Sequence, residues 1–382
     1  MAKTNNSAPL WSKNFITVLI SHFFLLFGFQ ALIPTIPLFA STFSTSETFI
    51  GLVAGVFTIS AFAIRPISGS FLDRKGRRMV LALSLITFIA SAFSYTLVTG
   101  LSSFLVLRFI HGLGWGSSNT ASDTVATDNI PLDRFGEGMG YFGLSMTLGM
   151  VVGPATGMFI ATNFGFNTLF YVSAFLVLLS LLISSTIKYE APIKKKEKEA
   201  LFVFDREALE PALLMSMITI SYGTLMGFIP LYAQQQGIAN TGPFFTVYAL
   251  AMLITRPFLG RLIDSHGFDY TVLPGISMVL VSMALVGLSF SLGSYLLVAV
   301  IYGTGFGSCL LSFQTMAIKN MPPEKRGGAN AVFYVGFDGG MTLGSILFGY
   351  IASQLGYSNM YLITLIPAAL ALLGYLLIRK NF

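Results

Sequence analysis

The chain has 382 residues, of which 54% are hydrophobic and only 10% are charged. Soluble domains carry roughly 25% charged residues, so this chain has too few charges to cover a water-exposed surface. The composition therefore excludes an ordinary soluble enzyme and indicates an integral membrane protein. The net charge of +6 would also suit a nucleic-acid-binding protein, but the positions of the basic residues, described below, exclude that class.

The apolar residues fall into twelve blocks. Each block is close to the ~20 residues that a helix needs to cross the hydrocarbon core of a bilayer. In chain order the predicted spans are 15–39, 48–72, 79–99, 102–126, 138–162, 167–187, 212–234, 243–265, 271–291, 294–318, 330–353 and 359–379. An even number of spans places both termini on the same side of the membrane.

Basic residues are confined to the termini and one set of alternate loops. Only Arg65, Arg108 and Arg256 depart from this pattern, because they lie inside predicted spans. The opposite set of loops contains no Lys or Arg. Under the positive-inside rule this asymmetry predicts a multi-pass protein of the cell membrane with both termini in the cytoplasm.

The sequence offers little for enzymatic or cofactor chemistry. The single cysteine, Cys309, lies inside a predicted span, so no intramolecular disulfide can form. No G-x-x-x-x-G-K-[ST] phosphate loop occurs, and no soluble segment is large enough for a nucleotide-binding domain. His22 has no second metal ligand at helical spacing. We therefore expect no enzymatic activity, no cofactor, no metal and no ATPase.

The two halves of the sequence repeat with an offset of 191 residues. Residues 63–76 align with 254–267, and 111–116 align with 302–307. The same offset places Gly149 and Gly153 on Gly340 and Gly344. One offset that serves three separate segments indicates duplication of a six-helix unit, with a site between the two copies.

This repeat predicts the domain organisation. We expect an N-terminal six-helix bundle over 1–187, a cytoplasmic linker over 188–210 and a C-terminal six-helix bundle over 211–382. The predicted fold is all-α, with twelve transmembrane helices in two pseudo-symmetric bundles around a central cavity. The basic run in the linker is interpreted as a solvated segment that obeys the positive-inside rule.

The loop between the second and third spans reads G-S-F-L-D-R-K-G-R-R over 69–78, and a weaker copy follows the eighth span. This loop resembles the diagnostic motif of the major facilitator superfamily, and the resemblance extends over the whole chain. Arg65, Gly69 and Asp73 are spaced by four residues and therefore share one helix face. A glycine on that face allows another helix to approach closely.

The resemblance implies that this loop and its copy latch the two halves together in one conformation. The predicted latch residues are Gly69, Asp73, Gly76 and Arg77 in the first copy, and Arg256, Gly260 and Asp264 in the second. A simple basic turn would explain the Arg and Lys residues, but it would not explain the spacing of Gly, Asp and Gly.

The fourth span reads L-R-F-I-H-G-L-G-W-G and is similar to the arginine-bearing motif of proton-coupled members of the family, with His111 where glutamine is common. Arg108 would lie about 9 Å below the outer surface, at 1.5 Å rise per residue. A charge at that depth costs at least ~2.5 kcal/mol and is a functional candidate by default. The alternative is an arginine that extends outward to the membrane surface.

The fifth span reads G-M-V-V-G-P-A-T-G over 149–157 and resembles the motif typical of the family's exporters. Gly149, Gly153 and Gly157 form one smooth face, and Pro154 can kink the helix. Met158 stands where the family usually has a further glycine. Close helix packing would explain the same glycines whether or not the protein is an exporter.

Asp338 is the acid that lies deepest inside a predicted span. It lies about 12 Å from the cytoplasmic face, and Arg65 lies at a similar depth. The resemblance places their two spans side by side across the boundary between halves, so we predict an ion pair that breaks and re-forms during transport. Separation of the pair could trigger proton uptake by Asp338. Thr147 is the repeat equivalent of Asp338, which leaves Arg256 without a matching acid. A static pair that only fixes packing is the alternative.

The first span contains no acid, although many drug:proton exporters carry one there; it has only His22 and Gln30. Asp123 and Glu137 are interpreted as interfacial residues flanking Arg134, with Asp123 also retained as a candidate for proton coupling. The predicted cavity residues are His22, Gln30, His111, Tyr141 and Tyr334.

These features predict a secondary active transporter that resembles the drug:proton antiporter branch, exporting a small organic or amphipathic compound by alternating access. Its expected partners are a small-molecule substrate, protons and the lipid bilayer, without nucleic acid, and a monomer is expected. Two alternatives remain open: a proton symporter or facilitator that imports a small metabolite, and a lipid flippase or non-transporting membrane sensor.

Overall fold

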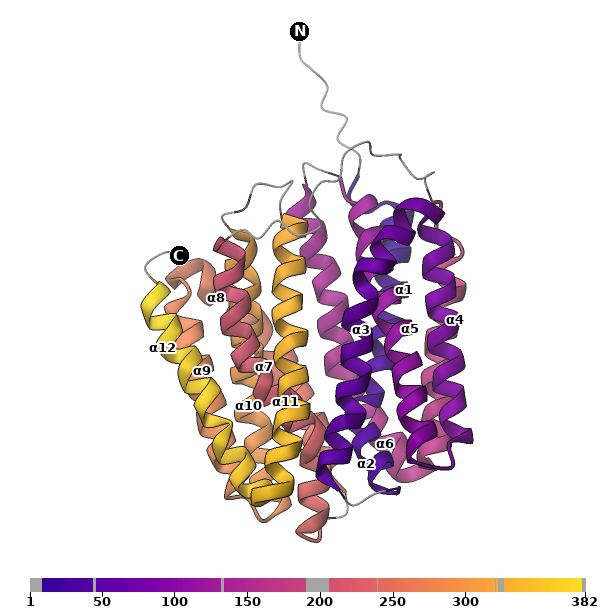
Figure 1. The fold of residues 1–382 in the computed structure, drawn as a ribbon. Helices are drawn as coiled ribbons and strands as arrows, with labels where there is room; N and C mark the ends of the chain where they lie inside the picture. The colour runs from indigo at the N-terminus through magenta and orange to yellow at the C-terminus, as the bar shows by residue number, and fades with distance from the viewer. Residues whose placement is uncertain are drawn as a thin grey trace.

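The computed structural model describes residues 9–43, 46–131, 134–189, 206–238, 240–319, 321 and 326–379. These residues are almost entirely helical (Figure 1). The N-terminal half contains α1 (Lys13–Leu32), α2 (Thr35–Ser41), α3 (Glu47–Lys75), α4 (Arg77–Ser94), the short 3-10 helix η1 (Tyr95–Leu97), α5 (Leu101–Asp128) and α6 (Phe135–Ser184). The C-terminal half contains α7 (Arg206–Gln235), α8 (Gly242–His266), α9 (Asp269–Gly287), α10 (Leu292–Lys319), α11 (Arg326–Ile363) and α12 (Leu365–Ile378).

These helices account for twelve passes. Nine stretches of the described residues are long and apolar enough to cross a membrane, and two of them are 47 residues long. Each of these two breaks in the middle at a glycine with positive φ, Gly165 (φ 84°) or Gly356 (φ 79°), and so makes two passes. The twelfth pass is α5, whose second half is rich in Ser, Thr, Asn and Asp. The two breaking glycines are separated by the same 191 residues as the sequence repeat.

The helices form two bundles side by side (Figure 1). The main contacts between the bundles are those of α3 with α11 and of α6 with α8. The start of α1 and the end of α12 lie at the same end of the molecule (Figure 1). The predicted all-α fold with twelve membrane-spanning helices is confirmed.

The region that was predicted to link the bundles is described only at its edges. Helix α7 begins at Arg206, inside the predicted linker 188–210. Residues 190–205, which include the basic run, lie outside the described residues. The division of the chain at this linker therefore stays a prediction.

The glycines of the fifth-span motif bring α6 against α1. A Cβ atom on Gly153 would lie 2.4 Å from Cβ of Gln30, and one on Gly157 would lie 2.1 Å from the carbonyl oxygen of Ala31. The second bundle repeats this contact, because a Cβ atom on Gly340 would lie 1.9 Å from the carbonyl oxygen of Ser216 on α7. The backbone of α6 stays helical at Pro154, and the break in this helix comes at Gly165. These glycines therefore serve close helix packing.

We expect Gly157→Ala to destabilise the protein by roughly 1–3 kcal/mol, as over-packing of a tight contact does. The added methyl group would meet backbone rather than a movable side chain, so α1 and α6 would have to separate. Gly140→Ala on the same helix is the matched control, since nothing lies within 4 Å of the position of its Cβ. Thermal unfolding of both variants in detergent tests this, and an equal melting temperature for the two would contradict it.

Candidate functional site: the cavity between the bundles

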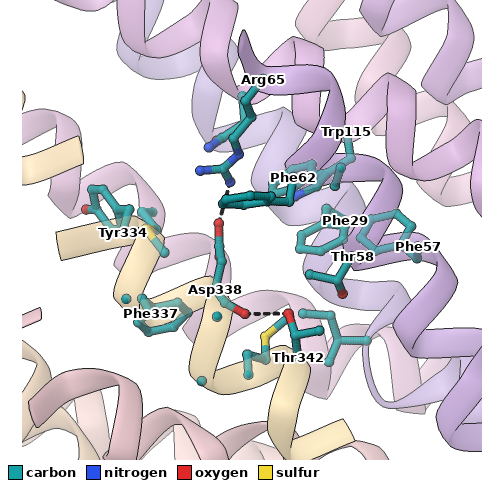
Figure 2. A pocket seen from close by; sticks show the side chains of 18 of the residues that line it. Phe29, Phe57, Thr58, Phe62, Arg65, Trp115, Tyr334, Phe337, Asp338 and Thr342 are labelled. Carbon is teal, nitrogen blue, oxygen red and sulfur yellow. Dashed lines mark hydrogen bonds and ion pairs between the residues drawn. The ribbon is translucent and has the colours of Figure 1, made fainter. Parts of the chain in front are cut away.

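A cavity of about 540 Å³ lies between the two bundles and is lined by residues of α1, α3, α5, α6, α7 and α11. This volume is within the range of small-molecule sites. The wall is largely apolar and includes several aromatic rings, and Figure 2 shows those of Phe29, Phe57, Phe62, Trp115, Tyr334 and Phe337 around the cavity. A cavity of this size and lining suits a small organic molecule with an apolar body.

Arg65 and Asp338 meet in this cavity (Figure 2). Nη2 of Arg65 on α3 donates to Oδ2 of Asp338 on α11, so the ion pair joins the two bundles. The arginine and aspartate side chains are 18% and 26% exposed. Nε of Arg65 is buried and has no hydrogen-bond partner among the described residues. The predicted contact is therefore present, and the arginine keeps an unused donor beside it.

The same contact recurs, without the acid, at the other interface between the bundles. Nη1 of Arg256 on α8 donates to Oγ1 of Thr147 on α6 at 2.8 Å. These two residues are the repeat equivalents of Arg65 and Asp338. The repeat therefore places an arginine at both interfaces, and among the described side chains a carboxylate pairs with the arginine at the interface of α3 with α11 but not at that of α6 with α8.

Asp123 is a further carboxylate of the cavity. It lies on α5 and lines the cavity together with Arg65 and Asp338, and it interacts electrostatically with both. The interpretation of Asp123 as an interfacial residue beside Arg134 is therefore wrong, because α5 turns this side chain towards the centre of the protein. No hydrogen bond to a described residue engages its carboxylate. Among the described residues, two acids and one arginine line the cavity.

The predicted latch is only partly described. Nε of Arg77 donates to Oδ2 of Asp128 at the end of α5 (2.9 Å), and Nη1 donates to the carbonyl oxygen of Leu72 (3.1 Å). Gly76 ends α3 with φ +90°, and its repeat equivalent Gly267 ends α8 with φ +87°. Both turns need a glycine, since other residues rarely adopt this conformation.

Other latch residues give no further support to the predicted contact. The side chains of Asp73 and Asp264 lie outside the described part of the structure, as does that of Glu137. A Cβ atom on Gly260 would meet nothing within 4 Å, so the second copy of the motif has no close helix approach at this glycine. Gly69 is half-buried within α3. The role of the latch remains a prediction.

The polar contacts of Arg108 and His111 lie within the N-terminal bundle. Nε of Arg108 donates to the carbonyl oxygen of Val53 (3.0 Å), Nη1 donates to the hydroxyl of Tyr95 (3.3 Å), and the guanidinium lies 4.1 Å above the ring of Phe57. The Tyr95 hydroxyl also bonds Nδ1 of His111 at 2.8 Å. His111 does not line the central cavity, so its prediction as a cavity residue is wrong. Arg108 is 6% exposed and does not extend to the membrane surface.

Of the other predicted cavity residues, three line the cavity and one does not. His22, Gln30 and Tyr334 line the cavity. Tyr141 does not; its ring packs 4.5 Å from that of Trp11. Tyr334 accepts a hydrogen bond from Nε2 of Gln314 (2.9 Å) and interacts electrostatically with Asp123, Arg256 and Asp338.

Sequence reasoning missed Asn119 and Trp115, both of which line the cavity from α5. Trp115, Asn119 and Asp123 are spaced by four residues and share one face of that helix. This spacing was the available signal, because a polar face on a membrane-spanning helix normally points into the bundle.

The sequence matches the family profile of the Major Facilitator Superfamily over residues 18–334 and 213–381. It is 25% identical to an uncharacterised transporter of this superfamily from Methanocaldococcus jannaschii, covering 96% of this chain and 99% of that one. It is 26% identical to the staphylopine export protein of Staphylococcus aureus, covering 86% of each chain. The multidrug resistance protein MdtG of Escherichia fergusonii is 24% identical, with 94% and 93% covered.

Solved structures share the fold at lower identity. A bacterial homologue of the human lysosomal transporter Spinster superposes with a TM-score of 0.77 at 15% identity, covering 98% of both chains. A POT family transporter in complex with 5-aminolevulinic acid gives 0.76 at 15% identity, covering 98% and 99%. The nucleoside transporter NupG gives 0.70 at 15% identity, covering 97% and 100%. The chain belongs to the Major Facilitator Superfamily and is a multi-pass membrane transporter of small molecules, not an enzyme.

Proposed function

We propose that this transporter exports a small organic, amphipathic compound from the cell in exchange for protons. The observation that carries the proposal is the composition of the cavity, where a largely apolar wall with several aromatic rings surrounds two carboxylates and one arginine among the described residues. The wall suits an apolar body, and the carboxylates suit proton binding. Export is favoured by the fifth-span motif and by the similarity to the staphylopine export protein and to MdtG.

The proposed coupling depends on the cavity having more carboxylates than arginines among its described residues. One carboxylate neutralises Arg65, which leaves the other without a counter-ion. A carboxylate that is removed from water without a partner favours its protonated form. We propose that Asp338 and Asp123 share the arginine, and that movement of α11 against α3 changes which of them holds a proton. The contact of Arg256 with Thr147 contains no carboxylate and takes no part in the proposed proton transfer.

The test is transport by the purified protein in sealed vesicles with an imposed proton gradient. The probe should come from a screen of susceptibility and retained metabolites in cells that lack the protein. We expect a gradient that is acidic on the outer face to drive the compound towards that face. Accumulation with the proton flow would support the alternative of an importing symporter. Equilibration without a response to the gradient would support a facilitator, and vesicles that move only lipid would support a flippase.

The proposed orientation places the α3–α4 turn and both termini in the cytoplasm. We expect a cysteine at Lys75 to react with an impermeant maleimide only after the cells are permeabilised, in a background where Cys309 is replaced by alanine. A cysteine at Phe290, in the connection between α9 and α10, should react in intact cells. Both positions are exposed, and Phe290 is 80% exposed. A difference in labelling would therefore report the side of the membrane rather than burial of the cysteine. The reverse labelling pattern would invert the topology.

A further inference from the structure

Arg256 on α8 faces α6 at the second interface between the bundles, and it keeps hydrogen-bond donors that no described residue uses. We propose that Arg256 and Thr147 form a binding site for a carboxylate group, and that the transported compound carries such a group. The inference rests on the proposed function, since it assumes that a small organic compound occupies the cavity. It adds the acidic group by which that compound is recognised.

The described residues engage one nitrogen of the Arg256 guanidinium. Nη1 donates to Oγ1 of Thr147 at 2.8 Å, whereas Nε and Nη2 donate to no described residue. The buried side-chain nitrogens that lack a partner among the described residues include Nε of Arg65, but neither of these two nitrogens of Arg256. Nε and Nη2 of Arg256 are therefore open to a ligand, whereas the unpartnered nitrogen of Arg65 is sealed.

The two open nitrogens form one edge of the guanidinium of Arg256. Their N–H bonds point the same way in the plane of the group, as a rigid fork. Such a fork matches the two oxygens of a carboxylate and gives two parallel, charge-assisted hydrogen bonds. The hydrogen bond from Nη1 to Thr147 lies outside this edge and restrains the side chain. The open edge is therefore suited to a planar anion with two oxygens.

The sequence repeat identifies the group that this interface lacks. Its offset of 191 residues conserves the arginine and replaces both acids by neutral residues, with Arg65 on Arg256, Asp338 on Thr147 and Asp123 on Gln314. Arg65 interacts with both carboxylates of its own interface. Arg256 has no carboxylate at either equivalent position. A cation removed from water without a counter-ion is unfavourable, so a ligand that supplies a carboxylate gains affinity.

Arg256 lies next to the wall of the central cavity. Tyr334 lines the cavity (Figure 2) and interacts electrostatically with Arg256. Met146, which precedes Thr147 on α6, lines the cavity as well. Arg256 therefore lies behind this part of the wall, and a compound in the cavity places its carboxylate there by passing Tyr334. In the proposed coupling the two cavity acids hold one proton and share Arg65, so they leave no net negative charge to repel it.

The depth of Arg256 decides between two sources of an anionic group, the transported compound and a lipid. Arg256 lies ten residues before the end of α8 at His266, about 15 Å along the helix at 1.5 Å rise per residue. The hydrocarbon core of a bilayer is about 30 Å thick, so this position lies well inside it. The phosphates of lipid headgroups lie outside the hydrocarbon, which favours the transported compound as the source.

The experiment measures equilibrium binding at neutral pH to the purified full-length protein in lipid nanodiscs, with empty nanodiscs as the blank. The probes are 4-phenylbutanoate and 4-phenylbutanamide, which share one apolar body and differ in the charged group. We expect the wild type to bind the carboxylate at least about tenfold more tightly than the amide. Two hydrogen bonds to a charged donor are worth at least this factor.

Arg256→Gln should bring the affinities for the carboxylate and the amide together. Arg256→Lys should keep only part of the difference, because lysine keeps the charge but has no planar fork. The matched control is Arg261→Gln, which removes an exposed arginine from the same helix and should leave the ratio unchanged. Because each ratio is measured within one variant, a loss of active protein affects both ligands equally.

The lipid of the nanodisc distinguishes the two sources of the anion. The wild type is measured in phosphatidylcholine alone and in phosphatidylcholine with phosphatidylglycerol, with enough salt to screen the surface charge of the anionic lipid. We expect the same ratio in both lipids. A ratio that falls to about one in the anionic nanodiscs would show that lipid phosphate occupies the site, and would overturn its assignment to the transported compound.

Equal binding of the carboxylate and the amide by the wild type would also overturn the inference. So would an undiminished ratio in Arg256→Gln, an equal loss of the ratio in Arg261→Gln, or no binding of either compound. None of these results depends on a proton gradient or on the direction of transport. Failure here would therefore leave the vesicle test of proton-coupled export to stand or fall separately.

Discussion

Asp338→Asn is expected to lower proton-driven accumulation by at least about tenfold, since a change of 1.4 kcal/mol already gives that factor and removal of one partner from a buried ion pair costs more. Asparagine keeps the shape of the side chain, but it cannot take up a proton or neutralise Arg65. The contact of Arg65 with Asp338 is the described ion pair that joins the two bundles inside the cavity. The measurement is accumulation of substrate in sealed vesicles under a fixed proton gradient.

The matched control is Asp269→Asn at the start of α9. This carboxylate also forms an ion pair, with Nη1 of Arg379 at 3.5 Å, and it accepts a hydrogen bond from Tyr375. It lies at the end of a helix, away from the cavity, so its loss should leave transport close to wild type. If Asp338→Asn still concentrates substrate as the wild type does, Asp338 has only a structural role.

Asp338→Asn should impair proton coupling more than it impairs folding. Asp123 lies in the same cavity and interacts electrostatically with Arg65, so the arginine keeps a counter-ion after the substitution. We expect the variant to reach the membrane and to exchange labelled for unlabelled substrate without a gradient. Retained exchange with lost accumulation would separate proton coupling from the movement of the bundles.

The features that the sequence predicted correctly depend on patterns that repeat along the chain. Twelve apolar blocks indicated twelve passes, and a single offset of 191 residues indicated two copies of one unit. The offset also paired Arg256 with Thr147, and the structure has a hydrogen bond between them. The contact of Arg65 with Asp338 could be predicted because a buried charge needs a partner at similar depth, and few other charges lie inside the spans.

The errors came from side-chain direction, which depends on how each helix is rotated in the bundle. Asp123 lies five residues from the end of α5, and distance along the helix alone suggested the membrane interface. Its direction follows from the face that it shares with Trp115 and Asn119. His111 and Tyr141 were chosen by residue type, and their helices turn them into packing contacts with Tyr95 and Trp11. Rotation of this kind is fixed by contacts between distant segments.

The strongest test of charge balance is the double variant Asp123→Asn/Asp338→Asn. It would leave Arg65 in the cavity with no carboxylate from the described residues that line it. An uncompensated buried charge costs roughly 3–5 kcal/mol, which is comparable to the whole stability of a marginal protein. We therefore expect the double variant to unfold at a much lower temperature than either single variant, by more than the sum of their two effects.

Adding Arg65→Gln to the double variant should restore the melting temperature, because all three positions are then neutral and can hydrogen-bond to one another. The same triple variant should not recover proton-driven accumulation, since neither remaining amide can take up a proton. Thermal unfolding and vesicle transport are measured for the two single variants, the double variant and the triple variant beside the wild type. Together they distinguish the role of these residues in charge balance from their role in proton coupling. A double variant as stable as the wild type would show that Arg65 needs no carboxylate, and recovered accumulation in the triple variant would remove all three residues from proton coupling.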